Sequence, residues 1–202
     1  MSSAQAASGA RVKVVLASAS PRRAELLRQI NIPFSVRVAA VDETPHPAET
    51  AADYVERLAQ DKAAAVARTG ELTLGADTTV VLDDEILGKP AGREEGVAML
   101  VRLGGRTHQV ITGVAVTDGR EMRALNAITD VTFRPISAAE AASYWDTGEP
   151  ADKAGGYGIQ GIGGIFAQRI NGSYSAVVGL PLTETEALLR EFGAQTWRHR
   201  DG

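Results

Sequence analysis

Short β-branched runs alternate along this chain with segments of helical periodicity, and this alternation limits the fold more than any other feature of the sequence. β-Branched runs predict buried strands, and apolar residues spaced three and four apart predict helices that cover them. Asp118-Gly119 lies between alternating runs at 107–117 and 121–133 and is typical of a hairpin turn, hence of antiparallel pairing. We therefore expect an α/β fold with a mixed twisted sheet and flanking helices, not an all-parallel sheet.

The same patterns predict the individual elements. Ser20 and Thr50 precede helical segments as N-caps do, and Ser137 with Glu140 has the spacing of a capping box. Because the 202 residues contain no repeat and no clear linker, we expect a tail at 1–10, one domain at 11–195 and a tail at 196–202. We expect strands at 12–17, 34–41, 72–82, 107–117 and 121–133, helices at 22–30, 50–69, 95–103, 137–145 and 181–192, and a glycine-rich loop at 147–164.

Composition excludes several classes of function. The chain has no cysteine, so a disulfide, a thiolate nucleophile and a Cys-based metal site are excluded. His46, His108 and His199 are scattered, so we expect any metal to have oxygen ligands, as Mg²⁺ does. The net charge is −4, from 21 Lys and Arg against 25 Asp and Glu, which argues against a nucleic-acid partner. The longest apolar run near the start, residues 14–17, is too short for a membrane span or secretory signal, so we expect a cytoplasmic protein without a membrane partner.

Three charged residues interrupt apolar patterns or lie close to such an interruption. Lys62 falls in the middle of the apolar stripe of the 50–69 helix, where it either snorkels past the edge or points into a polar cleft. Asp77 lies within the buried run 74–82, where an unpaired carboxylate is costly; it either binds a partner or caps a strand end. Glu43 lies in a loop and is either solvated or part of the same site.

Two further groups carry positive charge. Arg22 and Arg23 lie in the first turn of a predicted helix after Ser18, and the free N–H groups of such a turn bind anions. The pair is either a phosphate cradle or a solvated basic pair. Lys89 precedes a proline at the end of a strand pattern, where its side chain is presented to the surroundings.

The glycine-rich segment contains the spacing G-x-G-x-x-G at 156–161, but no strand precedes it and no helix follows, so a dinucleotide fingerprint is excluded. Its backbone is suited to wall a flat ligand, and Gln160 can donate and accept at the edge of a base. Together, the cations, the carboxylates and the flexible backbone fit metal-assisted hydrolysis of a phosphate ester or anhydride better than acyl transfer or redox chemistry.

Long collinear motifs over about residues 12–193 make the chain similar to the Maf family of nucleotide pyrophosphatases. The opening motif is Leu16-Ala17-Ser18-Ala19-Ser20-Pro21-Arg22-Arg23, followed by Glu25-Leu26-Leu27. The later motifs are Glu43, Tyr54-Val55-x-Arg57-Leu58-Ala59 leading to Lys62, Gly75-Ala76-Asp77-Thr78, Lys89-Pro90, Thr107-His108-Gln109-Val110, Asp152-Lys153-Ala154-Gly155 through Gly161, Asn171-Gly172-Ser173-Tyr174 and Val178-Gly179-Leu180-Pro181.

The resemblance implies a cleft across the sheet, similar to the inosine-triphosphate pyrophosphatase type, and hydrolysis of a nucleoside triphosphate to the monophosphate and pyrophosphate. It implies a divalent metal, Mg²⁺ first and Mn²⁺ or Co²⁺ as alternatives, and a homodimer. In the family, the position of Asp77 is the proton acceptor, and the positions of Arg22, Thr78 and Gln160 are tied to base choice. The family's phosphate and metal site matches Ser18, Arg22, Arg23, Glu43, Lys62 and Lys89.

These residues resemble the branch of the family that acts on dTTP and UTP. Our hypothesis is that Glu43 and Asp77 hold the metal, that Asp77 also takes a proton from water, and that the cations neutralise the phosphates. Three alternatives stay open: the branch that acts on methylated GTP, a regulatory protein of septum formation and cell division that acts by binding, and a nucleic-acid-binding protein, which the negative net charge disfavours.

Overall fold

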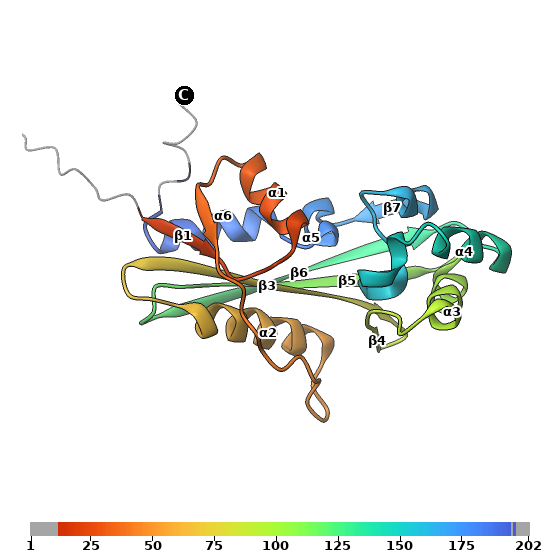
Figure 1. Ribbon diagram of the computed structural model, residues 1–202, viewed down its shortest axis with the longest axis horizontal. Helices are drawn as coiled ribbons and strands as arrows, with labels where there is room; N and C mark the ends of the chain where they lie inside the picture. The colour runs from red at the N-terminus through yellow and green to blue at the C-terminus, as the bar shows by residue number, and fades with distance from the viewer. Residues whose placement is uncertain (1–11, 195, 197–202) are drawn as a thin grey trace, which may run out of the picture.

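A mixed seven-stranded sheet forms the centre of the structure, a computed structural model that describes residues 12–194 and 196. Helices cover both faces of the sheet (Figure 1). The strand order is β2-β1-β3-β5-β6-β7, and β4 pairs with β3 beside this path. β1 is parallel to β2 and β3, whereas all other pairs are antiparallel. The predicted fold class, a mixed sheet with flanking helices, is confirmed.

The described part of the chain forms seven strands, six α-helices and three short 3₁₀-helices. The strands are β1 (Lys13–Leu16), β2 (Phe34–Val36), β3 (Glu71–Leu82), β4 (Glu85–Leu87), β5 (Thr107–Thr117), β6 (Met122–Phe133) and β7 (Ala167–Asn171). The α-helices are α1 (Pro21–Gln29), α2 (Ala51–Val66), α3 (Arg93–Leu103), α4 (Ala138–Trp145), α5 (Tyr174–Val178) and α6 (Leu182–Glu191). Three short 3₁₀-helices are η1 (Glu149–Asp152), η2 (Ala154–Gly156) and η3 (Ile162–Phe166).

The predicted strand at 34–41 is too long, since only Phe34–Val36 forms β2. β2 is an edge strand that pairs only with β1, and the last bond of this ladder runs from Arg37 N to Leu16 O, where β1 ends. Without a partner strand the remaining residues leave the sheet. The predicted caps form as expected: Ser20, Thr50 and Ser137 each accept a hydrogen bond from the first turn of their helix.

Two hydrophobic cores lie on one face of β3, and α2 packs on the other. The residues of β3 that face the cores alternate with those that face α2, as the pleat of a strand requires. The first core is built around Leu16, Leu27, Leu74, Val114 and Leu188, and the second around Val80, Leu100, Val131, Phe133 and Phe166. Thr78 lies on β3 between Leu74 and Val80, and so between the two cores.

Helix α2 packs directly against two glycines of the sheet, Gly75 and Gly113. A Cβ atom built on Gly75 would lie 2.1 Å from Ala59 O, and one on Gly113 would lie 2.5 Å from Val55 O. Gly113 pairs directly with Asp77 in the β3–β5 ladder. The helix that carries Lys62 is therefore seated directly beside the strand that carries Asp77.

The first predicted tail and residues 197–202 lie outside the described residues. Thr196 is described: it is buried, and its hydroxyl donates a hydrogen bond to Glu186 of α6. Within the described part of the chain, no helix is both long and apolar enough to cross a membrane.

Candidate functional site

The site lies beside a stretch of β3 that, within the described residues, pairs with no strand on one side. On that side β1 pairs with residues 71–74 and β4 pairs with residues 80–82, whereas β5 runs along the other side as far as Val81. Neither β1 nor β4 pairs with residues 75–79, so this stretch forms an open edge inside the sheet. The open edge adjoins the carboxyl end of β1, where α/β sheets commonly bind ligands.

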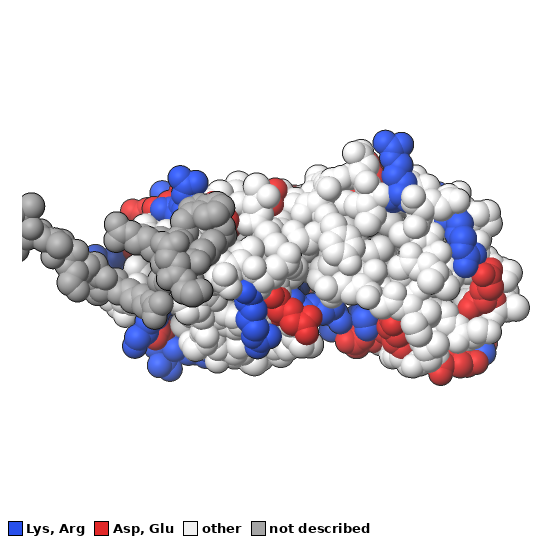
Figure 2. All heavy atoms as spheres, turned by 90° about the horizontal axis from the view of Figure 1, so that it is seen from above, with Lys and Arg blue, Asp and Glu red and all other residues white. Residues whose placement is uncertain are grey.

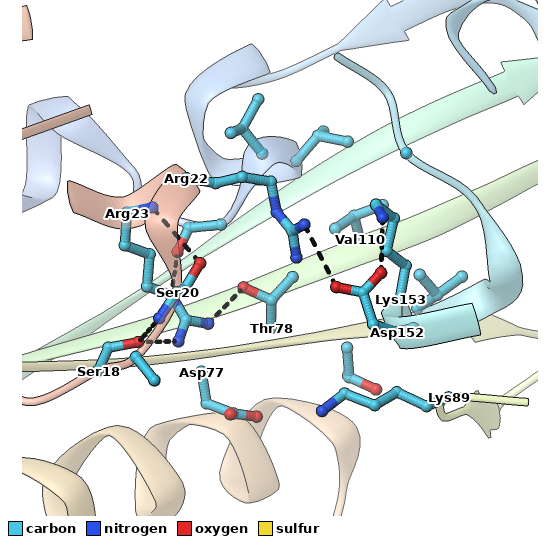
Figure 3. A pocket seen from close by; sticks show the side chains of 18 of the residues that line it. Ser18, Ser20, Arg22, Arg23, Asp77, Thr78, Lys89, Val110, Asp152 and Lys153 are labelled. Atoms are coloured by element: carbon cyan, nitrogen blue, oxygen red, sulfur yellow. Dashed lines mark hydrogen bonds and ion pairs between the residues drawn. The ribbon is translucent and has the colours of Figure 1, made fainter. Parts of the chain in front are cut away.

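A cavity of about 650 Å³ occupies this gap, and it brings together all of the predicted site residues. Seen from above, positive and negative side chains meet at the narrow middle of the elongated molecule (Figure 2). The predicted residues that line the cavity are Ser18, Arg22, Arg23, Glu43, Lys62, Asp77, Thr78, Lys89 and Gln160. Figure 3 shows how several of their side chains converge from α1, β3 and the segment after β4.

Lys62 joins the two predicted carboxylates. Its Nζ lies 2.6 Å from Asp77 Oδ1 and 2.6 Å from Glu43 Oε1. Lys62 and Asp77 are buried, whereas the side chain of Glu43 is 53% exposed. The hydrogen bond from Lys62 lowers the pKa of Glu43 below its ordinary value. Lys62 therefore points into a polar site and does not snorkel to solvent. Asp77, which lies inside the sheet, has a charged partner in Lys62 of α2.

The loop that carries Glu43 is anchored to α2 by two residues of that helix. Tyr54 Oη donates to the backbone oxygen of Glu43 at 2.9 Å, and Arg57 donates to Thr44 O at 3.2 Å and to both oxygens of Glu49. Burial, together with the charges of Asp77 and Glu43, raises the pKa of Tyr54. α2 thus positions both Lys62 and its loop partner.

Arg23 lies in the first turn of α1 and holds three parts of the chain together. Its Nε donates to Gly179 O at 2.8 Å, and its two terminal nitrogens donate to Ser18 Oγ at 3.1 Å and to Thr78 Oγ1 at 3.3 Å (Figure 3). Burial lowers the pKa of this guanidinium. Each terminal nitrogen carries two hydrogens, so both can still donate to an anionic ligand.

The Thr78 hydroxyl belongs to a directed hydrogen-bond chain. Thr112 Oγ1 donates its hydrogen to Ala176 O at 2.8 Å, so it accepts from Thr78 Oγ1 at 3.0 Å. Thr78 in turn accepts from Arg23. The structure therefore connects Thr78 to the orientation of Arg23.

Arg22 and Lys89 reach the cavity from opposite ends. Arg22 Nη1 lies 3.8 Å from Asp152 Oδ2, and Asp152 also accepts from Lys153 Nζ at 2.6 Å. The side chain of Lys89 extends towards Asp77 (Figure 3). Asp152 and Tyr54 line the cavity but are absent from the residues predicted to act there. Asp152 lies in a matched motif beside Lys153, which is the signal that could have identified it.

The donor set fits a hard divalent cation. Glu43 and Asp77 come from a loop and a strand and reach the same ammonium group, which shows that their oxygens can share one cation. Among the described residues no three His, Asp or Glu side chains gather as a complete metal site. Mg²⁺ commonly takes one or two protein carboxylates and completes its shell with substrate phosphates and water.

Fold and site together define an α/β protein with a cleft that can hold a polyanionic ligand. The chain belongs to the Maf family: the sequence pattern described as "Maf-like protein" matches residues 13–192. It is 50% identical over 192 residues to a protein of Hahella chejuensis named dTTP/UTP pyrophosphatase, covering 93% of this chain and 96% of that protein. A protein of Yersinia pestis with the same name is 54% identical over 183 residues, covering 89% of this chain and 93% of that protein.

A solved Ham1 protein of Staphylococcus aureus aligns with a TM-score of 0.45 and 15% identity, over 60% of this chain and 71% of that chain.

Proposed function

We propose that the chain hydrolyses nucleoside triphosphates, dTTP and UTP in particular, to the monophosphate and pyrophosphate. The observation that supports this most is a single cavity in which Lys62 lies between Glu43 and Asp77, with Arg22, Arg23 and Lys89 lining the same space. The names of the relatives support the choice of substrate.

In the proposed reaction a water oxygen forms a bond to the α-phosphorus, and the bond from that phosphorus to the α,β-bridging oxygen breaks. The electron pair of the broken bond leaves with pyrophosphate, and Asp77 accepts the proton of the water. Arg22, Arg23 and Lys89 neutralise the charge that develops on the phosphate oxygens. Lys62 orients Asp77 through the 2.6 Å contact between them.

Glu43 and Asp77 would hold the metal, Mg²⁺ in the first instance and Mn²⁺ or Co²⁺ as replacements. When bound, the cation neutralises negative charge on the triphosphate and on the departing pyrophosphate. Ser18 would add a hydroxyl donor on the side of the cavity where Arg23 lies.

We assign the selectivity for the nucleobase to Arg22, Thr78 and Gln160. Gln160 is exposed on the cavity wall and carries both a donor and an acceptor, as the edge of a pyrimidine requires. Thr78 would act through Arg23, which donates to its hydroxyl.

The test is pyrophosphate release from a panel of dTTP, UTP, CTP, GTP, modified pyrimidine triphosphates and methylated GTP, with Mg²⁺ and with chelator. We expect dTTP and UTP to be preferred, and chelation to abolish release.

Asp77→Asn is expected to lower kcat by about 10²-fold or more, the scale of general-base catalysis. Near-normal turnover in this variant would contradict the role of Asp77.

Two results would overturn the proposal. Preference for methylated GTP would move the chain to the other branch of the family. Nucleotide binding without release of pyrophosphate would favour the regulatory protein of septum formation, which acts by binding. We further propose that residues 11–195 form one catalytic domain, that the protein is a cytoplasmic homodimer, and that neither nucleic acid nor membrane is a partner.

A further inference from the structure

Glu149, the first residue of η1, is half-buried and accepts four hydrogen bonds through its carboxylate and its backbone oxygen. Its Oε1 accepts from Tyr144 Oη at 2.6 Å and from Gly163 N at 3.0 Å, and its Oε2 accepts from Ile162 N at 2.9 Å. Its backbone oxygen accepts from Lys153 Nζ at 2.6 Å. Burial favours the neutral form, but the hydrogen bonds outweigh it and lower the pKa of Glu149. The carboxylate is therefore a fixed acceptor for two backbone N–H groups of the glycine-rich segment.

Two glycines of this segment, Gly158 and Gly161, lie close to the same carboxylate. A Cβ atom built on Gly161 would lie 2.2 Å from Glu149 Oε2, and one on Gly158 would lie 3.0 Å from Glu149 Oε1. Tyr144 completes the arrangement, because its Oη also accepts from Gly158 N at 3.0 Å. Gly161 therefore packs against Glu149 alone, whereas Gly158 packs against both Glu149 and Lys153.

The segment held in this way, residues 158–163, is called loop 158–163 and includes the first two residues of η3; its residues 158–161 form a wall of the cavity. Ile159, Gln160 and Gly161 line the cavity, and Ile159 packs against both hydrophobic cores. Glu149 itself does not line the cavity. Its effect on a ligand must therefore pass through the loop.

We propose that Glu149 is a positioning residue, which holds loop 158–163 in the shape that presents Gln160 to the cavity and so sets the selectivity for the nucleobase. The role in selectivity rests on the proposed function, whereas the role in holding the loop does not.

The experiment compares the full chain with Glu149→Ala, Glu149→Gln and Gln160→Ala, and with Asp146→Ala as a matched control. Asp146 is a carboxylate next to the same segment, but its partner is Arg93. Hydrogen exchange is measured at the amides of Ile162 and Gly163, and kcat and KM are measured for UTP and GTP.

In Glu149→Ala both amides are expected to exchange at least about tenfold faster, because they lose their acceptor. The UTP/GTP ratio of kcat/KM is expected to fall by about tenfold or more, mainly through a higher KM for UTP, and Gln160→Ala is expected to do the same. Glu149→Gln keeps one carbonyl acceptor and should lie between wild type and Glu149→Ala, while Asp146→Ala should match wild type in both measurements.

Unchanged exchange at both amides in Glu149→Ala would overturn the proposal. Faster exchange with an unchanged UTP/GTP ratio, while Gln160→Ala lowers that ratio, would overturn the role in selectivity. If the alanine variant does not fold, the glutamine variant decides on the same criteria. If wild type releases no pyrophosphate from any nucleotide, the proposed function fails, and exchange still decides whether Glu149 holds the loop.

Discussion

We expect the buried residue His108 to make the stability of the fold depend on pH. It is 2% exposed, its Nε2 is 2.8 Å from Tyr157 Oη, and its Nδ1 has no hydrogen-bond partner among the described residues. The rings of Phe133 and Tyr157 pack edge-on against it, at 4.8 and 5.5 Å between centroids. Burial lowers the pKa of His108 to about 4.

Because the folded state resists protonation of His108, the unfolded state binds more protons between about pH 6.5 and the lowered pKa of His108. The contribution is fully present above pH 6.5 and is lost as the pH falls to about 4. We expect the free energy of unfolding to drop by up to roughly 3 kcal/mol across this window from His108 alone. Urea unfolding at several pH values would measure it.

The control for this prediction is His108→Gln, which keeps a polar partner for Tyr157 but does not titrate. Its free energy of unfolding should decline less steeply from pH 6.5 to 4 than that of wild type. Parallel curves for the two proteins would show that other groups, such as Glu43, cause the loss.

Single residues of the site could be predicted where they broke an apolar pattern. Lys62 and Asp77 stood out because a charge within a buried segment is costly. Glu149 is not indicated in this way, because a polar residue in a loop resembles any solvated one, and Tyr54 is indicated only by its place in a matched motif. The bond from Arg23 to Gly179 joins residues 156 positions apart, and nothing in the local sequence indicates it.

At the scale of elements, the two glycines that face α2, Gly75 and Gly113, connect the packing of this helix to the position of Lys62 in the site. Gly113→Ala would place a Cβ atom 2.5 Å from Val55 O and 2.9 Å from Glu56 N, so α2 must move away from the sheet. We expect this to cost about 1–3 kcal/mol of stability, the usual cost of overpacking. We also expect kcat to fall further than stability explains, because Lys62 moves with the helix away from Asp77.

Gly92→Ala is the matched control, since a Cβ atom there meets nothing within 4 Å. Its effect on stability should stay within about 1 kcal/mol, and its kcat should match wild type. If Gly113→Ala retains wild-type kcat at a temperature where it is fully folded, the close seat of α2 is not needed for the reaction.

The longer elements and the short strand β1, expected at 12–17, could be predicted from sequence, whereas no bounds were predicted for β4, β7 and α5. β3, β5, β6 and α2 have strong periodicity and defined turns, and they form close to their expected bounds. β4 and β7 have three and five residues, and α5 has five. Their formation depends on neighbours already in place, so local patterns carry little information about them.

For the molecule as a whole, residues of both hydrophobic cores line the cavity: Val178 belongs to the first core, and Val80 and Tyr157 belong to the second. Ser18 and Arg22 reach it from the side of the first core, and Lys89 and Asp152 reach it from the side of the second. A ligand that contacts both sets would connect the two halves. The cavity itself could not be predicted from local patterns, because it is formed by the spacing between β1 and β4 along β3.

We therefore expect a non-hydrolysable α,β-methylene UTP with Mg²⁺ to stabilise the fold. At a ligand concentration 100 times Kd the gain is about 2.7 kcal/mol, which corresponds to a rise in Tm of about 5–11 °C for a chain of this size. Thermal unfolding monitored by fluorescence would measure it. Uridine, which lacks phosphates, is the control, and an equal shift with uridine would contradict a phosphate site.

Hydrogen exchange at the open edge of β3, residues 75–79, should also show whether a ligand occupies the cavity. Successive amides of a strand point to opposite sides, so every second amide of this stretch points to β5 and the others point to the gap. Hydrogen exchange along five consecutive residues should therefore alternate between slow and fast in the free protein. A ligand that fills the gap would slow only the fast set, so one short peptide would report binding without a label, a reaction or a mutation.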